Sequence, residues 1–257
     1  MLKDRGPISS VGRGHSVPSP ELWVLRLTDV DATQLDLSLL DGEERQRAAH
    51  LARPVDRVSY MAAHTVLRRL LGGHLGLPPR EVTYRREPCP RCGAPHGRPA
   101  VNVPDQPLHF SLSRSGGMVL IGIASVPIGV DIEMLAQPEI VNSVGALLHA
   151  AERKEIFLAA PSKRSQVFTR IWTRKEAYLK GIGMGITDDL AAEDLGGEEP
   201  TNAPQGWTVV KLPVATGYAA AVAIGRPAQS QPVVEWRQGV DRWAQTGRFV
   251  TKQQARL

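Results

Sequence analysis

The stretch Pro127-Ile128-Gly129-Val130-Asp131-Ile132-Glu133 places two carboxylates two residues apart in an otherwise apolar, β-branched run. Such a run predicts a strand, and alternate side chains of a strand share one face. Asp131 and Glu133 then point the same way, while Val130 and Ile132 point into the core. Acids placed there cost stability unless a cation or hydrogen bonds meet them. The run therefore favours a divalent metal site, for which Mg²⁺ suits the oxygen ligands; two acids on the exposed face of an edge strand are the alternative.

Size and charge limit the classes of protein to consider. The 257 residues suffice for one large or two small domains, and the net charge of +5 indicates anionic partners, which include nucleic acid, polyphosphate ligands and acidic protein surfaces. No apolar run reaches the roughly 18 residues of a membrane span, and the first 20 residues lack the apolar core of a secretory signal. Two cysteines are too few for a disulfide framework. We therefore expect a cytoplasmic protein with no membrane partner.

The apolar periodicity predicts strands and helices mixed along the chain. Asp41 followed by Glu44 has the spacing of a helix-capping box, and Pro54 and the pair Gly72-Gly73 predict helix ends. Three helices are predicted: one that begins at Leu39 and stops at Pro54, one at residues 56–71 and one at residues 168–183. The predicted strands cover residues 22–27, 82–84, 108–112, 118–124, 128–133 and 219–224, with a turn at 113–117.

The second half of the chain repeats the first. Leu39-Leu40 with Glu44-Arg45 recurs 108 residues later as Leu147-Leu148 with Glu152-Arg153, and Thr65, Leu71 and Gly73 recur at the same offset as Thr173, Leu179 and Gly181. A nearly constant offset across several elements indicates a duplicated unit. We infer an α+β protein of two similar halves related by a pseudo-two-fold axis, with a ligand site in the cleft between them.

These patterns divide the chain into four parts. Residues 1–20 are rich in Gly, Ser and Pro and are predicted to be a flexible leader. The N-terminal lobe covers residues 21–126 and the C-terminal lobe residues 127–225. Residues 226–257 are rich in Pro, Gln and Arg, and we expect a basic, partly mobile tail there.

The helix predicted at residues 168–183 carries a third acid. Glu176 shares a face with Trp172, which places a carboxylate near the apolar side of the helix. An exposed pair of Glu176 with Lys180 four residues on is the alternative. Together with the two acids of the strand at residues 128–133, Glu176 would complete a three-carboxylate metal site.

Three ordered segments now resemble a known family. Residues 110–115 (FSLSRS), 128–133 (IGVDIE) and 172–181 (WTRKEAYLKG) resemble the three motifs of the 4'-phosphopantetheinyl transferases, of the large two-lobed type that activates peptide and polyketide synthetases. The resemblance covers about residues 22 to 225. It implies two similar α+β lobes in one monomer, with coenzyme A bound between them.

The resemblance also implies a reaction and its residues. Phosphopantetheine would pass from coenzyme A to a serine of an apo acyl or peptidyl carrier protein, leaving 3',5'-ADP. Asp131, Glu133 and Glu176 would bind Mg²⁺, or Mn²⁺, and Lys180 would stabilise or protonate the departing nucleotide. Glu152 would be the general base on the carrier serine, with Glu155, one turn on, as the alternative base.

The resemblance also implies which residues bind the cofactor. Ser113 and Arg114 lie in the first motif, and Lys175 would contact a phosphate. Arg98 stands where the family often has Gly-Lys-Pro, and Arg45, Arg47 and Arg57 are further candidates for the 3'-phosphate. At Arg114 the family commonly has His, and a guanidinium keeps its charge at any working pH.

The segment Cys89-Pro-Arg-Cys92-Gly-Ala-Pro-His96 resembles a zinc knuckle. A structural zinc requires four ligands, and only three are evident locally. We therefore do not expect zinc here and favour a reduced loop. Three more distant histidines are the candidates for a fourth ligand: His64, His74 and His109.

Two other functions remain open at this stage. A metal-dependent phosphohydrolase or nuclease could use the same acids. A nucleic-acid-binding module could use the cysteine segment and the basic tail, but the tail has few aromatic residues for base stacking. We expect a carrier protein and coenzyme A as partners, and no nucleic acid.

Overall fold

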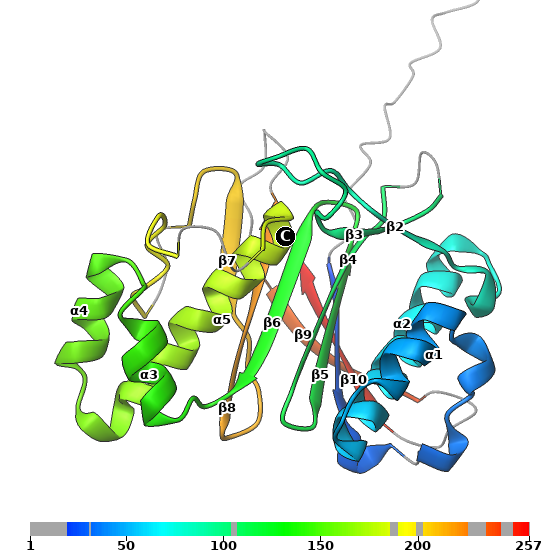
Figure 1. The fold of residues 1–257 in the computed structure, drawn as a ribbon, viewed down its shortest axis with the longest axis horizontal. Helices are drawn as coiled ribbons and strands as arrows, with labels where there is room; N and C mark the ends of the chain where they lie inside the picture. Colours follow the sequence, from blue (N-terminus) through cyan, green and yellow to red (C-terminus); the bar gives the residue numbers. More distant parts are fainter. Residues whose placement is uncertain are drawn as a thin grey trace, which may run out of the picture.

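The computed structural model describes residues 20–30, 32–103, 107–185, 190–198 and 203–225, and the backbone of residues 235–242 and 249–256. The predicted leader lies outside this part, apart from Pro20. The structure mixes helices and strands, which confirms the predicted α+β class (Figure 1). Among the helices of the described residues, none has both the length and the apolar character needed to cross a bilayer.

Strands β4, β5 and β1 form the antiparallel sheet of the N-terminal half, with a long helix packed against it. The elements of this half are β1 (Glu21–Arg26), α1 (Gly42–Ala49), α2 (Pro54–Leu75), β2 (Tyr84–Arg86), β3 (Pro99–Val101), β4 (His109–Ser115) and β5 (Met118–Ala124). β2 and β3 form a separate two-stranded sheet. Trp23, Leu67, Leu71 and Ile121 belong to the apolar cluster that joins α2 to the larger sheet.

The C-terminal half has the same plan of strands and helices. Its elements are β6 (Ile128–Met134), α3 (Pro138–Gly145), α4 (Ala150–Leu158), α5 (Arg164–Ile182), β7 (Trp207–Lys211) and β8 (Tyr218–Gly225). The strand order β6-β8-β7 corresponds to β1-β5-β4 in the first half, and every pair is antiparallel. In Figure 1, α5 lies across the strands of this half and α1 and α2 lie at the other end of the molecule.

The end of the chain returns to the first sheet. β9 (Glu235–Arg242) pairs with β10 (Phe249–Arg256), and β10 pairs antiparallel with β1, which gives the sheet order β4-β5-β1-β10-β9. The sequence analysis expected a partly mobile tail here because the region is rich in Pro, Gln and Arg. The described backbone instead extends the N-terminal sheet by two strands.

The predicted repeat is visible in the helix caps. Asp41 caps α1 by accepting from Glu44 N at 2.8 Å, and the Glu44 carboxylate accepts from Asp41 N at 3.0 Å. His149 and Glu152 form the same reciprocal box at the start of α4, with Glu152 Oε2 accepting from His149 N at 3.0 Å. The predicted capping box at Asp41 is confirmed, and its counterpart begins α4 108 residues later.

Each of these glutamates meets a buried cation from the long helix of its own half. Arg68 Nε of α2 lies 2.7 Å from Glu44 Oε2, and Lys175 Nζ of α5 lies 3.0 Å from Glu152 Oε2. All four side chains are buried. The two halves therefore share a helix cap, a buried carboxylate and a cation, which supports the duplication at the level of contacts.

Several predicted boundaries were wrong. The helix predicted to begin at Leu39 and stop at Pro54 is α1, residues 42–49, and the strand predicted at residues 82–84 is β2, residues 84–86. The ends of α2 and β4 were also misplaced. α2 continues through Gly72-Gly73 to Leu75 and ends at Gly76, whose φ of 67° is the left-handed conformation that glycine tolerates. Strand β4 runs to Ser115, so the turn is confined to Gly116 and Gly117, with φ of 52° and 87°. Propensity alone misplaced both ends because tertiary contacts extend the elements.

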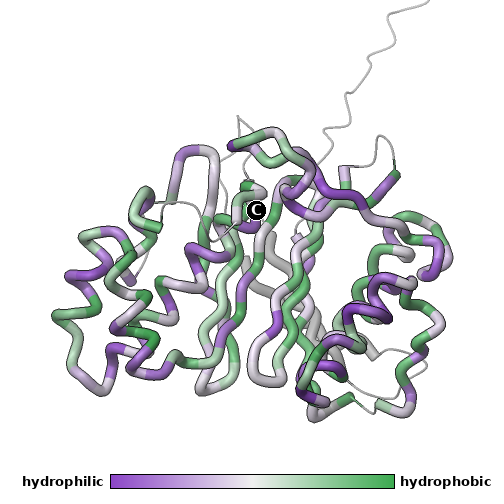
Figure 2. The backbone as a smooth tube through the Cα atoms, viewed as in Figure 1, coloured by the Kyte–Doolittle hydropathy of each residue, from purple (hydrophilic) through white to green (hydrophobic). Residues whose placement is uncertain are grey.

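The two halves join along β6, which is buried on both faces. Ile128, Val130 and Ile132 pack into an apolar cluster with residues of β1, β5 and β8. The central strands are largely green, that is hydrophobic, in Figure 2. Alternate serines of β4 bond to β6: Ser111 Oγ accepts from Val130 N at 3.0 Å, Ser113 Oγ donates to Asp131 Oδ1 at 2.7 Å, and Ser115 Oγ accepts from Met134 N at 3.1 Å.

The other face of β6 lies against α5 at a close approach of two glycines. A Cβ added to Gly129 would lie 1.9 Å from Ala177 O and 2.4 Å from Gly181 N. A Cβ added to Gly181 would lie 2.6 Å from the Trp207 ring. Backbone atoms cannot yield as side chains can, so position 129 requires glycine.

We expect Gly129→Ala to lower the free energy of unfolding by about 1–3 kcal/mol or more, because the added methyl group overpacks the contact between β6 and α5. Gly73→Ala in α2 is the matched control, since a Cβ there meets nothing within 4 Å. It should raise stability by up to about 1 kcal/mol through helix propensity. Urea unfolding measures both changes, and equal stability of the two variants would contradict the packing argument.

Candidate active site

A cavity of about 660 Å³ lies between residues of the two halves. Its N-terminal lining comes from α1, α2, β2, β4 and the segment before β3, and its C-terminal lining is Lys180 with residues 183–185. Six cationic side chains line it against three acids. The cations are Arg47, Arg85, Arg86, Arg98, Arg114 and Lys180, and the acids are Asp41, Glu43 and Glu44. This excess of positive charge suits a polyanionic ligand.

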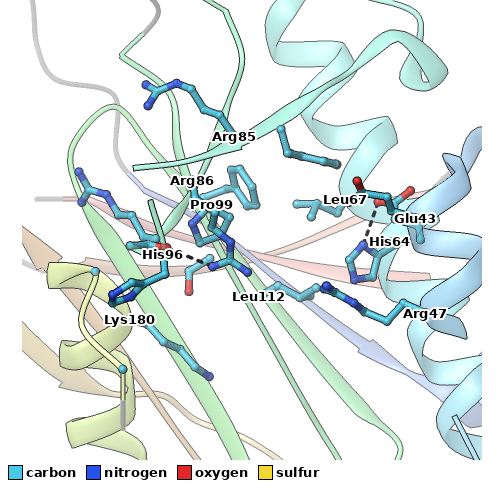
Figure 3. A pocket seen from close by; sticks show the side chains of 18 of the residues that line it. Glu43, Arg47, His64, Leu67, Arg85, Arg86, His96, Pro99, Leu112 and Lys180 are labelled. Atoms are coloured by element: carbon cyan, nitrogen blue, oxygen red, sulfur yellow. Dashed lines mark hydrogen bonds and ion pairs between the residues drawn. The ribbon is translucent and has the colours of Figure 1, made fainter. Parts of the chain in front are cut away.

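Figure 3 shows how these side chains are arranged. Arg47 and His64 approach from the helices of the N-terminal half, and Lys180 approaches from α5 on the opposite side. Arg86 lies between them, and His96 lies on the side of Lys180. The cavity thus receives cations from both halves, as the predicted cleft requires.

Only some of the predicted cofactor-binding residues line this cavity. Those that do are Arg47, Arg98, Arg114 and Lys180, and those that do not are Arg45, Arg57, Ser113 and Lys175. Arg45 donates to Leu40 O and Arg57 donates to Leu51 O at 3.1 Å, so both are committed to the ends of α1. The positions of these two arginines give no support to a role in binding the 3'-phosphate.

Arg114 and Arg98 both line the cavity, and each has its own contacts. The Arg114 guanidinium lies 5.1 Å from the centre of the Tyr60 ring, and burial lowers its pKa from the usual range. Arg98 Nε donates to Glu87 at 2.5 Å, and Arg98 Nη1 donates to Gly181 O at the end of α5 at 3.0 Å. Arg98 therefore links the two halves, while Arg114 presents a cation from the first motif.

Asp131 is the most deeply buried of the three predicted metal ligands, with 1% of its surface exposed. Its Oδ1 accepts from Ser113 Oγ at 2.7 Å and from Lys180 Nζ at 2.6 Å. Its Oδ2 is buried and has no hydrogen-bond partner among the described residues. An unpaired carboxylate oxygen at this depth is costly, and a bound cation would satisfy it.

Glu133 and Glu176 lie close enough to Asp131 to feel its charge. Burial, and then the Asp131 carboxylate, raise the pKa of Glu176 to about 7 against the opposing effect of Lys180. Burial and then Asp131 also raise the pKa of Glu133, although a hydrogen bond with Ser115 lowers it. The structure therefore brings the three predicted acids into one electrostatic cluster behind Lys180.

The donors of this cluster fit a hard divalent cation. They are carboxylate oxygens, and Asp131 Oδ2 and Glu176 Oε1 are both buried without a partner in the described residues. The three acids do not converge as tightly as the thiol and imidazole atoms of Cys89, Cys92 and His96, which lie within 4.8 Å of one another. Mutual repulsion keeps carboxylates apart when no cation lies between them.

A model of the 4'-phosphopantetheinyl transferase superfamily matches residues 127–221, which hold all three acids and Lys180. Over this segment the chain is similar to members of this superfamily. It is 29% identical over 212 residues to the 4'-phosphopantetheinyl transferase HetI of Nostoc sp., a match that covers 79% of this chain and 86% of that protein.

Two further relatives agree with this assignment. The chain is 31% identical over 188 residues to a phosphopantetheinyl transferase of Thraustochytrium sp., covering 65% of this chain and 62% of that protein. It is 28% identical over 151 residues to the 4'-phosphopantetheinyl transferase gsp of Aneurinibacillus migulanus, covering 58% of each. The resemblance found in the three motifs is confirmed.

Glu152 and Lys175 lie apart from the cavity. Glu152 is fully buried, accepts from Leu195 N at 2.8 Å and from His149 N, and pairs with Lys175. Lys175 also donates to Glu193 O at 2.5 Å. Both side chains are occupied inside the C-terminal half, so this geometry supports neither a general base at Glu152 nor a phosphate contact at Lys175.

Glu155, the alternative base, is occupied as well. Its carboxylate pairs with Arg170 and accepts from Gly197 N at 2.8 Å. Arg174, which the sequence analysis did not single out, donates to the carbonyl oxygens of residues 195–198. These contacts hold the segment 190–198 against α4 and α5.

Among the cavity residues that the sequence analysis did not connect with cofactor binding are Arg85 and Arg86, which it did not name, and His64 and His96, which it considered only as zinc ligands. His64 stacks on Tyr60 with 4.0 Å between ring centres, and its Nδ1 lies 3.0 Å from Glu44 Oε1. The adjacent basic residues of β2 were the available signal for Arg85 and Arg86. Their strand is only three residues long, and its place above the cavity is set by pairing with β3.

We predict that Glu176 destabilises the metal-free protein as pH rises. Its folded-state pKa of about 7 lies above the ordinary value of 4.5, so folding favours the protonated form. Stability present at low pH is lost between pH 4.5 and 7, by about 2–3 kcal/mol for a shift of this size. Urea unfolding in EDTA across this range should show a smaller loss in Glu176→Gln than in the native protein, because the raised pKa of Glu133 remains in the variant.

Glu139→Gln provides the control, because Glu139 is an exposed acid in the first turn of α3. It should leave the pH profile of the native protein unchanged. Identical profiles for Glu176→Gln and the native protein would contradict the raised pKa.

Proposed function

We propose that the protein transfers the 4'-phosphopantetheine group of coenzyme A to a serine of an apo carrier protein, releasing 3',5'-ADP. The observation that carries this proposal is the cluster of three acids behind Lys180, beside a cationic cavity; Asp131 and Glu176 are buried and Glu133 is half-buried. Similarity to the superfamily supports this class of reaction, and the excess of cations in the cavity supports a polyanionic co-substrate.

In this proposal Asp131, Glu133 and Glu176 hold Mg²⁺, or Mn²⁺. The bound cation would neutralise charge on the diphosphate as the bond to the leaving nucleotide breaks. Lys180 is positioned to contact the phosphate oxygens on which this charge develops, because its Nζ lies 2.6 Å from Asp131 Oδ1 and its side chain lines the cavity. The Lys180 ammonium group would exchange its ion pair with Asp131 for a contact with a phosphate oxygen, and would so stabilise the departing 3',5'-ADP.

The cationic side chains orient coenzyme A. Arg114, with its guanidinium on Tyr60, presents donors that can grip a phosphate bidentately. Arg47 faces Lys180 across the cavity, and Arg98 closes it beside the end of α5. These positions place cations along the length that a nucleotide with several phosphates would occupy.

For Glu152 we propose a positioning role instead of the predicted one. Its contacts fix α4, α5 and the segment 190–198 together, and its exposed fraction of 0% leaves no route to a carrier serine. Its counterpart Glu44 makes the same cap and the same type of ion pair in the N-terminal half. A shared architectural contact explains both residues.

The carrier protein, its pathway and the large two-lobed type remain proposals, as do the monomeric state and the cytoplasmic location. A phosphohydrolase using the same acids would release product from coenzyme A without a carrier. The deciding experiment is incubation of the purified protein with coenzyme A, Mg²⁺ and a panel of apo carrier proteins, followed by mass spectrometry of the carriers. A carrier that gains phosphopantetheine supports the proposal, and hydrolysis with no gain in mass of any carrier overturns it.

We expect Asp131→Ala and Glu176→Ala to reduce turnover by at least about 100-fold, since either change removes a metal ligand that stabilises the transition state. Circular dichroism should show both variants folded. The native enzyme should lose activity in EDTA and recover it with Mg²⁺ in excess.

Glu139→Ala is the matched control because it removes an exposed acid from the same half. It should retain full turnover. Full activity of Asp131→Ala, or of the native enzyme in EDTA, would refute the metal site.

We predict that Arg114→Ala raises KM for coenzyme A by about 10- to 100-fold, the effect of losing a charge-assisted contact of 1.5–3 kcal/mol. Discrimination against 3'-dephospho-coenzyme A should weaken in the same variant. Arg114→His should restore binding better at pH 6 than at pH 8, because imidazole is cationic only below a pKa near 6.5.

Arg57→Ala serves as the control, since Arg57 is exposed and lies outside the cavity lining. It should leave KM unchanged. If Arg114→Ala discriminates between the two cofactors as the native enzyme does, another residue holds the 3'-phosphate.

A further inference from the structure

The segment before β3 gathers three metal-binding side chains outside the acid cluster. One ligand atom from each of Cys89, Cys92 and His96 lies within 4.8 Å of the other two, and Cys92 Sγ is 3.0 Å from His96 Nε2. Neither cysteine is in a disulfide. The sequence analysis counted three local ligands but could not show that they converge.

Backbone hydrogen bonds within the loop help to hold this arrangement. Cys89 N donates to Ala94 O at 2.8 Å, and Gly93 N donates to Cys89 O at 2.8 Å, which closes a tight loop. Gly93, directly after the second cysteine, has φ of 73°, a left-handed conformation that turns the chain back. This turn brings His96 against Cys92, so the ligands are preorganised by the loop.

The donor set matches zinc. Two thiolates and one imidazole are soft and borderline ligands, which select zinc over Mg²⁺. Zn–S and Zn–N bonds of about 2.3 and 2.0 Å in a tetrahedron place sulfur and nitrogen about 3.5 Å apart. The observed 3.0 Å contact needs to lengthen by only a fraction of an ångström to admit the ion.

The position of the loop leaves one coordination site open. Cys89 is buried, while Cys92 and His96 are exposed. The three histidines considered as a fourth ligand are absent from the group of described residues that could hold a metal: His64 pairs with Glu44, His74 faces Glu21 and His109 lies in β4. Two cysteines, one histidine and an open fourth position form a known type of zinc site.

We propose that Cys89, Cys92 and His96 bind one zinc ion, with water as its fourth ligand, at the rim of the cavity. The site is separate from the Mg²⁺ cluster and does not depend on the proposed transfer reaction. His96 itself lines the cavity and is followed directly by Gly97 and Arg98, which line it too. Zinc bound there fixes the segment that carries Arg98.

The test uses the full chain without an affinity tag, expressed with added zinc and passed through a desalting column. Mass spectrometry of the metal content should find one zinc per chain. Cys92→Ser and His96→Ala should each reduce the bound zinc at least about tenfold, and their circular dichroism should match the native protein because both positions are exposed. His50→Ala is the matched control, since His50 is an exposed histidine outside the group, and it should keep one zinc per chain.

A second measurement identifies the ligands directly. Co²⁺ added to the zinc-free protein should give the near-ultraviolet band of cobalt–thiolate bonds, and Cys92→Ser should weaken that band. The proposal is overturned if the native protein holds no zinc and gives no cobalt band. It is equally overturned if both variants keep their zinc, or if the cysteines form a disulfide that excludes metal under reducing purification.

Discussion

The buried carboxylate of Asp131 is the interaction on which the rest of the structure depends. It belongs to β6, accepts from Ser113 of β4 in the other half, and accepts from Lys180 of α5. One side chain therefore ties together the first half, the second half and the helix that carries the third acid. A buried carboxylate is tolerated here because Ser113 and Lys180 both donate to its Oδ1. Its Oδ2 is buried without a partner in the described residues, and a bound cation would satisfy it.

The contacts that the two halves share help to separate structural residues from those of the proposed metal site. Both halves have a buried glutamate that caps a short helix and pairs with a cation from a long helix. The second half adds three acids and Lys180 to this shared frame. A residue such as Glu152 can then look catalytic in a motif alignment while its contacts are those of the frame, and the matching pair in the first half makes the distinction clear.

The sequence predicted much of this because local rules decide it. The alternation around Asp131 fixed a strand and a shared face, and the spacing from Asp41 to Glu44 fixed a helix start. It could not predict which cations reach the cavity, since Arg85 and Arg86 are placed by the pairing of two short strands distant from the acids. It also could not show that Lys175 turns away from Lys180 to meet Glu152. Those choices depend on packing between elements, which no single stretch of sequence contains.

The return of the chain end to the first sheet affects how the protein is made. Strand β1 pairs with β5 on one side and with β10 on the other. During synthesis the N-terminal half emerges first, but one edge of β1 lacks its neighbour until residues 249–256 leave the ribosome. An exposed strand edge is prone to pairing with other chains. The last strand thus delays completion of the first sheet, and a chain shortened at its C-terminus would carry a permanent unpaired edge beside an otherwise finished fold.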